Sequence, residues 1–396
     1  MKLSLFELLY GLSEALDHVE SEWHPLPKVH AKKTAYFAVR MGECAGLKKE
    51  KLYQLALAGL FHDSGITRSQ GGLCREKEGT KEELKFRLLA GEENFMQLPI
   101  RNPKPHLVLF HRERGDGSGA FGRKAGEYPR EAGWLHLAER VSRLEAGWDE
   151  KTLRKEEIER KLQELKGRVL DPGAVELFFR AEPRLEAGDL FIKEYLRKIL
   201  PDDHSEWMEE EVGRFSLLMA RIVDERCGPS CVHSREITRR IQLLAEYYQY
   251  PEVIREKLCL AGALHDLGKL VIPLEVLNKP GTLSEQEVKE MRDHVLYTYY
   301  ILNRIPGLQE ITMWASAHHE KLNGKGYPFH LSGEQLFYPA RMVACVDIYQ
   351  ALREPRAYKA EKSHESAVQI MKEMAQAGEI DPMIVDDLEK LFRGNL

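Results

Sequence analysis

The chain has 396 residues, with 58 Lys and Arg against 63 Asp and Glu, so its formal net charge at pH 7 is only −5. This small imbalance gives no strong positive field and argues against a nucleic acid polymer as the partner. The length suggests two or three domains. No apolar run reaches the ~18 residues that a membrane span needs. Six scattered cysteines and an N-terminus without a signal-peptide core predict a reduced, cytoplasmic protein.

The first half of the chain places histidines and carboxylates within apolar helical patterns. His30 precedes the pair His62-Asp63 by 32 residues, and His111 and Glu139 follow in later apolar stretches. Apolar residues recur at helical spacing in both halves, and sustained period-two alternation is scarce. The pattern predicts an all-α fold. Imidazole and carboxylate groups also suit divalent metals.

The two halves of the chain are predicted to meet between residues 181 and 205. A stretch from Glu182 to Gly188 ends the first half, and a helical pattern from Leu190 to Leu200 stops at Pro201. We therefore expect a first domain over residues 1–180, a linker helix over 181–205 and a second domain over 206–396.

The second half carries a richer set of the same residue types. His233 precedes the pair His265-Asp266 by 32 residues. Lys269 follows, and on a continuous helix it would share a face with His265, because residues four apart stack. Further ligand types come later in the chain, at His294, His318, His319 and Asp347.

The halves repeat one pattern. Residues 57–65 (LAGLFHDSG) match residues 260–268 (LAGALHDLG), residues 111–119 mirror residues 318–326, and Glu139 falls where Asp347 stands. An internal repeat of this length predicts tandem domains of one type. The first half departs from the second at three positions, because Ile66, Arg87 and Arg112 stand where Lys269, His294 and His319 would.

Residues from about Val232 to the C-terminus, with the doubled histidine and the loop that ends in Gly326-Tyr327-Pro328, resemble the HD-GYP domain. This family comprises metal-dependent phosphodiesterases of bacterial cyclic di-GMP signalling. The first half resembles a degenerate HD domain. The resemblance implies two tandem HD-type helical domains and an enzyme that hydrolyses cyclic di-GMP, with either pGpG or GMP as the final product.

The resemblance also implies a binuclear metal site. Asp266 would bridge the two metals, and the remaining ligands would be His233, His265 and Asp347 for one metal and His294, His318 and His319 for the other. Two metals are expected rather than three, because Pro229 stands where three-metal members carry a glutamate. Iron or manganese suits such ligands best, although zinc and nickel also bind them.

Substrate contacts follow from the same resemblance. Lys269 would contact the phosphate, and Arg356, Tyr358 and Lys359 would contact the dinucleotide. Tyr327 is the exposed aromatic residue on the loop through which family members are proposed to bind diguanylate cyclase (GGDEF) domains, and it also lies near the active site. The sequence leaves open whether the chain forms a homodimer.

Several alternatives stay open. The first domain would hold one residual metal through His30, His62, Asp63 and Glu139, or would be a metal-free domain that regulates or scaffolds the second. Gln350 and Ala357 depart from the family pattern, so another cyclic dinucleotide or nucleotide remains an alternative substrate. A non-catalytic cyclic di-GMP sensor or interaction protein is the alternative from a different class.

Overall fold

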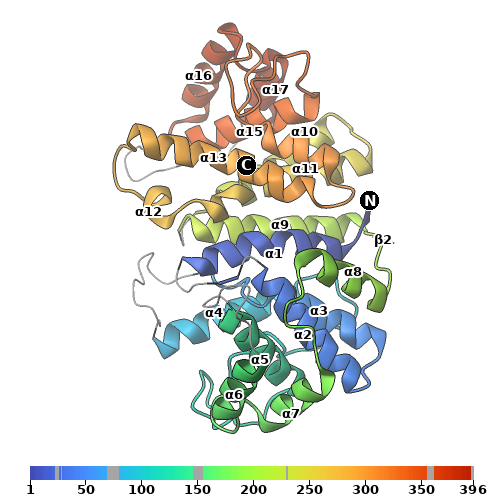
Figure 1. Ribbon diagram of the computed structural model, residues 1–396. Helices are drawn as coiled ribbons and strands as arrows, with labels where there is room; N and C mark the ends of the chain where they lie inside the picture. Colours follow the sequence, from blue (N-terminus) through green and yellow to red (C-terminus); the bar gives the residue numbers. More distant parts are fainter. Residues whose placement is uncertain are drawn as a thin grey trace. The chain divides into compact units, whose positions relative to one another are not determined.

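The computed structural model describes residues 1–22, 26–27, 29–68, 80–145, 155–228, 231–354 and 361–393. The chain divides into two compact units, one formed by Ser4–Ser205 and the other by Met1–Leu3 with Glu206–Leu396 (Figure 1). Helices build both units, apart from two strands of two residues, β1 (Lys2–Leu3) and β2 (Ser205–Glu206). The prediction of an all-α fold is confirmed. None of the helices in the described ranges is long and apolar enough to cross a membrane.

The first unit is organised around one central helix. Its helices are α1 (Leu5–Ser21), α2 (His30–Cys44), α3 (Lys49–Phe61), α4 (Lys81–Met96), α5 (Arg130–Glu145), α6 (Lys155–Leu165), α7 (Pro172–Ala181) and α8 (Asp189–Ile199). Helix α2 packs against α1, α3, α5, α7 and α8, and its Phe37 and Val39 are fully buried. Helix α8 lies in the stretch expected as a linker, yet it buries Ile192 and Leu196 within the first unit.

The second unit has the same plan. Its helices are α9 (Glu209–Arg226), α10 (His233–Tyr247), α11 (Glu252–Leu264), the short 3₁₀ helix η1 (Leu267–Val271), α12 (Leu274–Leu277), α13 (Glu285–Asn303), α14 (Gln309–Ser316), α15 (Tyr338–Arg353), α16 (His364–Gln376) and α17 (Pro382–Leu391). Helix α10 packs against α9, α11 and α15, and α13 packs against η1 and α14. Ser284 and Glu287 form the expected capping box at the start of α13.

The sequence repeat is also a repeat of structure. Helices α2 and α10 are both 15 residues long and begin at His30 and His233, and α3 and α11 are both 13 residues long and end just before a His-Asp pair. Helices α7 and α17 both begin with proline after a capping aspartate. The elements that carry the histidines therefore occupy matching places in both units.

An aspartate from the preceding helix fixes the start of each histidine-bearing helix. In the second unit, the carboxylate of Asp224 accepts hydrogen bonds from the backbone N–H groups of Ser234 and Arg235, at 2.7 and 3.2 Å. In the first unit, Asp17 accepts from the N–H of Ala31, at 3.1 and 3.2 Å. These bonds satisfy N–H groups that the helix itself leaves free and hold the first histidine of each repeat in place.

Candidate metal centre

The second unit brings together all seven residues that the sequence suggested as metal ligands. Their side-chain N and O atoms fall into overlapping groups whose members lie within 4.8 Å of one another: His233, His265 and Asp347; His265, Asp266 and His318; and His294, His318 and His319. They come from the start of α10, the end of α11, the middle of α13, the end of α14 and the body of α15. Residues up to 114 positions apart in the sequence thus share one buried cluster.

Asp266 lies at the centre of this cluster, and its two carboxylate oxygens face different histidines. Oδ2 lies 3.1 Å from Nε2 of His265 and 3.9 Å from Nε2 of His233. Oδ1 lies 3.2 Å from Nε2 of His294 and 3.9 Å from Nε2 of His318. A carboxylate that bridges two metal ions needs this division of its oxygens between two ligand sets.

Backbone carbonyls orient three of the histidine rings. Nδ1 of His265, His294 and His318 lies 2.7, 2.5 and 2.6 Å from the carbonyl oxygen of the residue three positions earlier. If each Nδ1–H donates to that carbonyl, each Nε2 turns its lone pair into the cluster, as metal-ligating histidines do. Nε2 of His265 is buried and makes no hydrogen bond to any described residue. These donors fit divalent metal ions of intermediate softness.

Two carboxylates hold His233. Its Nε2 lies 3.0 Å from Oδ1 of Asp347, and its Nδ1 lies 2.9 Å from Oε2 of Glu354. Burial alone would lower the pKa of His233, but the bonds to Asp347 and Glu354 outweigh burial and raise it to about 10. A metal ligated by His233 must displace that proton. The sequence analysis missed Glu354, which directly follows the last residue of α15, seven positions or about two helical turns after Asp347.

The doubled histidine is held in its neutral form. Burial lowers the pKa of His318, and it lowers that of His319 to about 4, so both rings are unprotonated at neutral pH. The ring of Tyr327 stacks on His319, with centroids 4.9 Å apart. Tyr327 is half-buried rather than exposed as expected, because this stacking turns its ring toward the histidine cluster. The Arg292 guanidinium lies 5.1 Å from the centroid of the Tyr327 ring.

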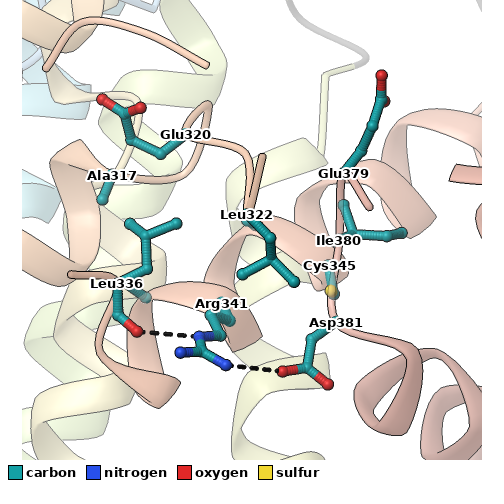
Figure 2. Close-up of a pocket in the computed structure, with 11 residues that line it drawn as sticks. Ala317, Glu320, Leu322, Leu336, Arg341, Cys345, Glu379, Ile380 and Asp381 are labelled. Carbon is teal, nitrogen blue, oxygen red and sulfur yellow. Dashed lines mark hydrogen bonds and ion pairs between the residues drawn. The ribbon is translucent and has the colours of Figure 1, made fainter. Parts of the chain in front are cut away.

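The loop after the doubled histidine is held from both sides. The carboxylate of Glu320 accepts hydrogen bonds from the N–H groups of Phe329 and Leu331, at 2.6 and 3.1 Å. Gly326 passes so close that a Cβ there would lie 2.4 Å from Cα of Glu320. Figure 2 shows the outer support, where Arg341 donates to the carbonyl of Leu336 and pairs with Asp381.

Lys269 reaches the cluster by a different route from the one predicted. Helix α11 ends at Leu264, so Lys269 lies on η1 and does not share a helix face with His265. The turn places its Nζ 2.5 Å from Oδ2 of Asp266. Gly268 makes this turn possible, because it lies directly against α13 and its N–H donates to Oγ1 of Thr298 at 2.9 Å.

Part of the predicted site lies outside the described residues. Arg356, Tyr358 and Lys359, predicted to contact the dinucleotide, belong to this part, and so does Pro229, on which the prediction of two metals depended. Gln350, which departs from the family pattern, is buried and accepts a hydrogen bond from Nε of Arg240 at 2.9 Å.

The first unit gathers its own cluster from His30, His62, Asp63 and Glu139, together with His111. Nε2 of His62 lies 2.8 Å from Oδ2 of Asp63. The structure adds Glu20, from α1, which the sequence analysis did not place there. Arg112, which stands where His319 would, pairs with Glu20, Asp63 and Glu139 at 2.8, 3.0 and 3.0 Å. The only signal for Glu20 in the sequence was its place within the largely apolar helical pattern of residues 5–21.

Part of the chain matches a known family, and relatives match over part or nearly all of it. Residues 217–384 match the HD domain family. Over 402 aligned residues, covering 97% of this chain and 91% of the relative, the chain is 26% identical to the 3'3'-cGAMP-specific phosphodiesterase 1 of Vibrio cholerae serotype O1. Over 175 aligned residues, covering 43% of this chain and 45% of the relative, it is 35% identical to the cyclic di-GMP phosphodiesterase response regulator RpfG of Xanthomonas campestris pv. campestris.

One solved structure matches the whole chain. The crystal structure of a cyclic GMP-AMP specific phosphodiesterase of V. cholerae (V-cGAP3) aligns with a TM-score of 0.67 and 23% sequence identity, covering 100% of this chain and 99% of that chain. At this identity the likeness concerns the fold. The match of residues 217–384 to the HD domain family confirms the prediction of an HD domain in the C-terminal half.

Proposed function

We propose that the second unit is a metal-dependent phosphodiesterase that hydrolyses a cyclic dinucleotide. The observation that carries the proposal is the central position of Asp266, with each oxygen facing a separate set of histidines. Under this proposal His233, His265 and Asp347 hold one divalent cation, and His294, His318 and His319 hold the other. Iron or manganese are our first candidates for the metal.

Bound cations of this kind lower the pKa of a water molecule and screen the charge of a phosphodiester. The protein side chains supply the rest. Burial alone would lower the pKa of Lys269, but the charge of Asp266 outweighs it and the pKa is raised. Lys269 therefore stays protonated at neutral pH. It is suited to stabilising negative charge on a phosphate rather than to removing a proton.

The substrate we propose is cyclic di-GMP, cleaved to pGpG and then to GMP. A second candidate is 3'3'-cGAMP, because the relative aligned over nearly the whole chain is named for that dinucleotide. The half-buried ring of Tyr327 favours a role beside His319, inside the site, over docking to a GGDEF domain. The Arg292 guanidinium above that ring is a further group that would attract a phosphate.

The test is turnover of each dinucleotide by the full chain with Mn²⁺ or Fe²⁺, followed by separation of the products. Asp266→Asn keeps the size of the side chain but removes the bridging charge, and we expect turnover to fall by at least about 10³-fold. Asp386→Asn is the control. Asp386 is exposed on α17 in the same unit, outside the histidine cluster, so its turnover should stay near that of the wild type.

Two outcomes would contradict the proposal. Turnover that survives Asp266→Asn would place the chemistry elsewhere. A chain that holds metal and binds the dinucleotide but returns it intact after long incubation would be a sensor. Turnover of 3'3'-cGAMP in clear preference to cyclic di-GMP would keep the mechanism and change the substrate.

A further inference from the structure

The first unit contains a second convergence of buried ligand atoms. Glu20, His30, His62 and Asp63 each offer an atom within 4.8 Å of the others. Glu20, His30 and His62 are 1%, 0% and 3% exposed. Nε2 of His62 faces Oδ2 of Asp63 at 2.8 Å, and Nε2 of His30 faces Oε2 of Glu20 at 3.7 Å, yet none of these four atoms makes a well-formed hydrogen bond to a described residue. Two imidazole nitrogens and two carboxylate oxygens that face one another suit a divalent cation held among them.

The two histidines are oriented as metal ligands. Nδ1 of His62 lies 2.8 Å from the carbonyl of Gly59, which repeats the bond between His265 and Gly262 in the second unit. Nδ1 of His30 lies 3.0 Å from Oγ of Ser142. Both rings are thus held by one nitrogen while the other faces the cluster, the arrangement that fixes a ligating tautomer.

An arginine stands in the place of the second cation. The Arg112 guanidinium lies 3.0 Å from Oδ1 of Asp63, the oxygen that faces away from His62. The matching oxygen of Asp266 faces His294 and His318.

A second arginine supports this correspondence. A Cβ on Gly65 would lie 2.1 Å from the carbonyl oxygen of Arg87, just as one on Gly268 would lie 1.9 Å from that of His294. Arg87 thus occupies the position of His294, so two of the three histidines of the second set are replaced by arginines.

Two guanidinium groups pair with the carboxylates of the cluster. Arg112 contacts Glu20, Asp63 and Glu139, and Arg143 contacts Glu20 and Glu139. Both arginines contact Oε1 of Glu20, and Arg112 contacts Oδ1 of Asp63. The other oxygens, Oε2 of Glu20 and Oδ2 of Asp63, face the histidines.

The size of the cavity limits what the cluster can bind. The cavity beside Glu20, His62, Asp63 and Arg112 has a volume of about 30 Å³. A water molecule needs about 10–15 Å³ by this measure, so an ion with one water fits. Pockets for organic ligands measure about 300–1,000 Å³, so a dinucleotide does not fit.

We propose that the first unit binds one divalent first-row metal ion through Glu20, His30, His62 and Asp63, with the Arg112 guanidinium in the place of a second ion. Two imidazoles and two carboxylates suit manganese, iron or zinc. The fourth ligand comes from α1, whereas the sequence pattern pointed to Glu139, which lies in a different group, with His62 and His111. The cavity is too small for a dinucleotide, so this ion stabilises the unit. The proposal does not depend on the function proposed for the second unit.

The test is the Mn²⁺ content of the full chain after stripping with a chelator and re-equilibration with the metal. Asp266→Ala removes the centre of the second unit's cluster, and in this background we expect about one Mn²⁺ per chain. Adding His62→Gln should remove that ion. Adding His136→Gln instead, at a buried histidine of α5 that is not among the four ligands, should leave it in place. Mn²⁺ should also raise the unfolding temperature of the Asp266→Ala chain, but not that of the chain that carries both Asp266→Ala and His62→Gln.

The outcomes separate this proposal from the previous one. No Mn²⁺ in the Asp266→Ala chain, or an ion that both His62→Gln and Glu20→Gln leave bound, would overturn the site. Glu20→Gln replaces His62→Gln in the test if far-UV circular dichroism shows that the latter is unfolded. If Asp266→Ala does not change the metal content while His62→Gln lowers it by about one ion, the first-unit site stands and the proposed second-unit centre fails.

Discussion

Gly268→Ala should break the candidate metal centre without touching a ligand. Gly268 lies between Asp266 and Lys269, where η1 meets α13. A Cβ there would lie 1.9 Å from the carbonyl oxygen of His294 and 2.8 Å from the backbone nitrogen of Thr298. Both atoms belong to helix backbone, so no side chain can turn aside to make room. The two elements must therefore move apart.

The size of the effect follows from these distances. Carbon–oxygen contacts below 3.0 Å are essentially never found, so η1 and α13 must separate by about 1 Å. Overpacking costs about 1–3 kcal/mol, and loss of the bond from the Gly268 N–H to Thr298 adds about 1 kcal/mol. The same movement carries His294 away from Asp266. In the wild type, Nε2 of His294 lies 3.2 Å from Oδ1 of Asp266. A displacement of about 1 Å costs about 10²-fold in turnover.

The assay compares thermal unfolding, metal content and turnover of Gly268→Ala with those of Gly213→Ala. Gly213 lies on α9 in the same unit, and a Cβ there meets no atom within 4 Å. Alanine at that position should stabilise the helix by up to about 1 kcal/mol. If Gly268→Ala unfolds at the wild-type temperature and keeps its metal and turnover, the close approach of η1 to α13 does not position the site.

Three further predictions concern other parts of the chain. Glu320→Gln weakens the hydrogen bonds that the Glu320 carboxylate accepts from the loop after His319. We expect the free energy of unfolding of the second unit to fall by about 1–3 kcal/mol, measured by calorimetry. Tyr327→Ala removes the ring stacked on His319 and should lower turnover about tenfold, whereas Tyr327→Phe, which keeps the ring, should match the wild type; equal turnover in both would contradict a positioning role. Burial alone would raise the pKa of Glu7, but Arg197 and Lys193 together outweigh burial and the pKa is lowered. The stability that Glu7 contributes is therefore full at neutral pH and is lost as the pH falls through its depressed pKa, so unfolding scans should show the cost of Glu7→Gln shrinking toward acid pH.

The features that could be predicted from the sequence are those that depend on residues close together in the chain or on a repeated pattern. Helical periodicity gave the all-α fold because one apolar face per helix must be buried. The spacing of His30 and His62, and again of His233 and His265, indicated the tandem plan, because each pair brackets two helices of the same lengths. The capping pair Ser284 and Glu287 was recognisable for the same reason, since all of its contacts lie within one turn.

Tertiary structure decided the features that depend on distant partners. Lys269 reaches Asp266 through a 3₁₀ turn, because α11 ends one residue before His265 and a helical face could not be extended past it. Tyr327 is half-buried because His319 provides a surface for its ring, which the pattern of a glycine-rich loop does not reveal.

The first unit shows this division most clearly. From the sequence, Arg112 was a lost ligand, and Glu20 was one glutamate among many. In the fold, Arg112 lies against Glu20, 92 positions away, and Asp63, 49 positions away. Local sequence fixes which residues share a helix face. Which buried charges meet across helices depends on how those faces pack. That packing brings Arg112 against Glu20 and Asp63 in the first unit and gathers the seven candidate ligands in the second.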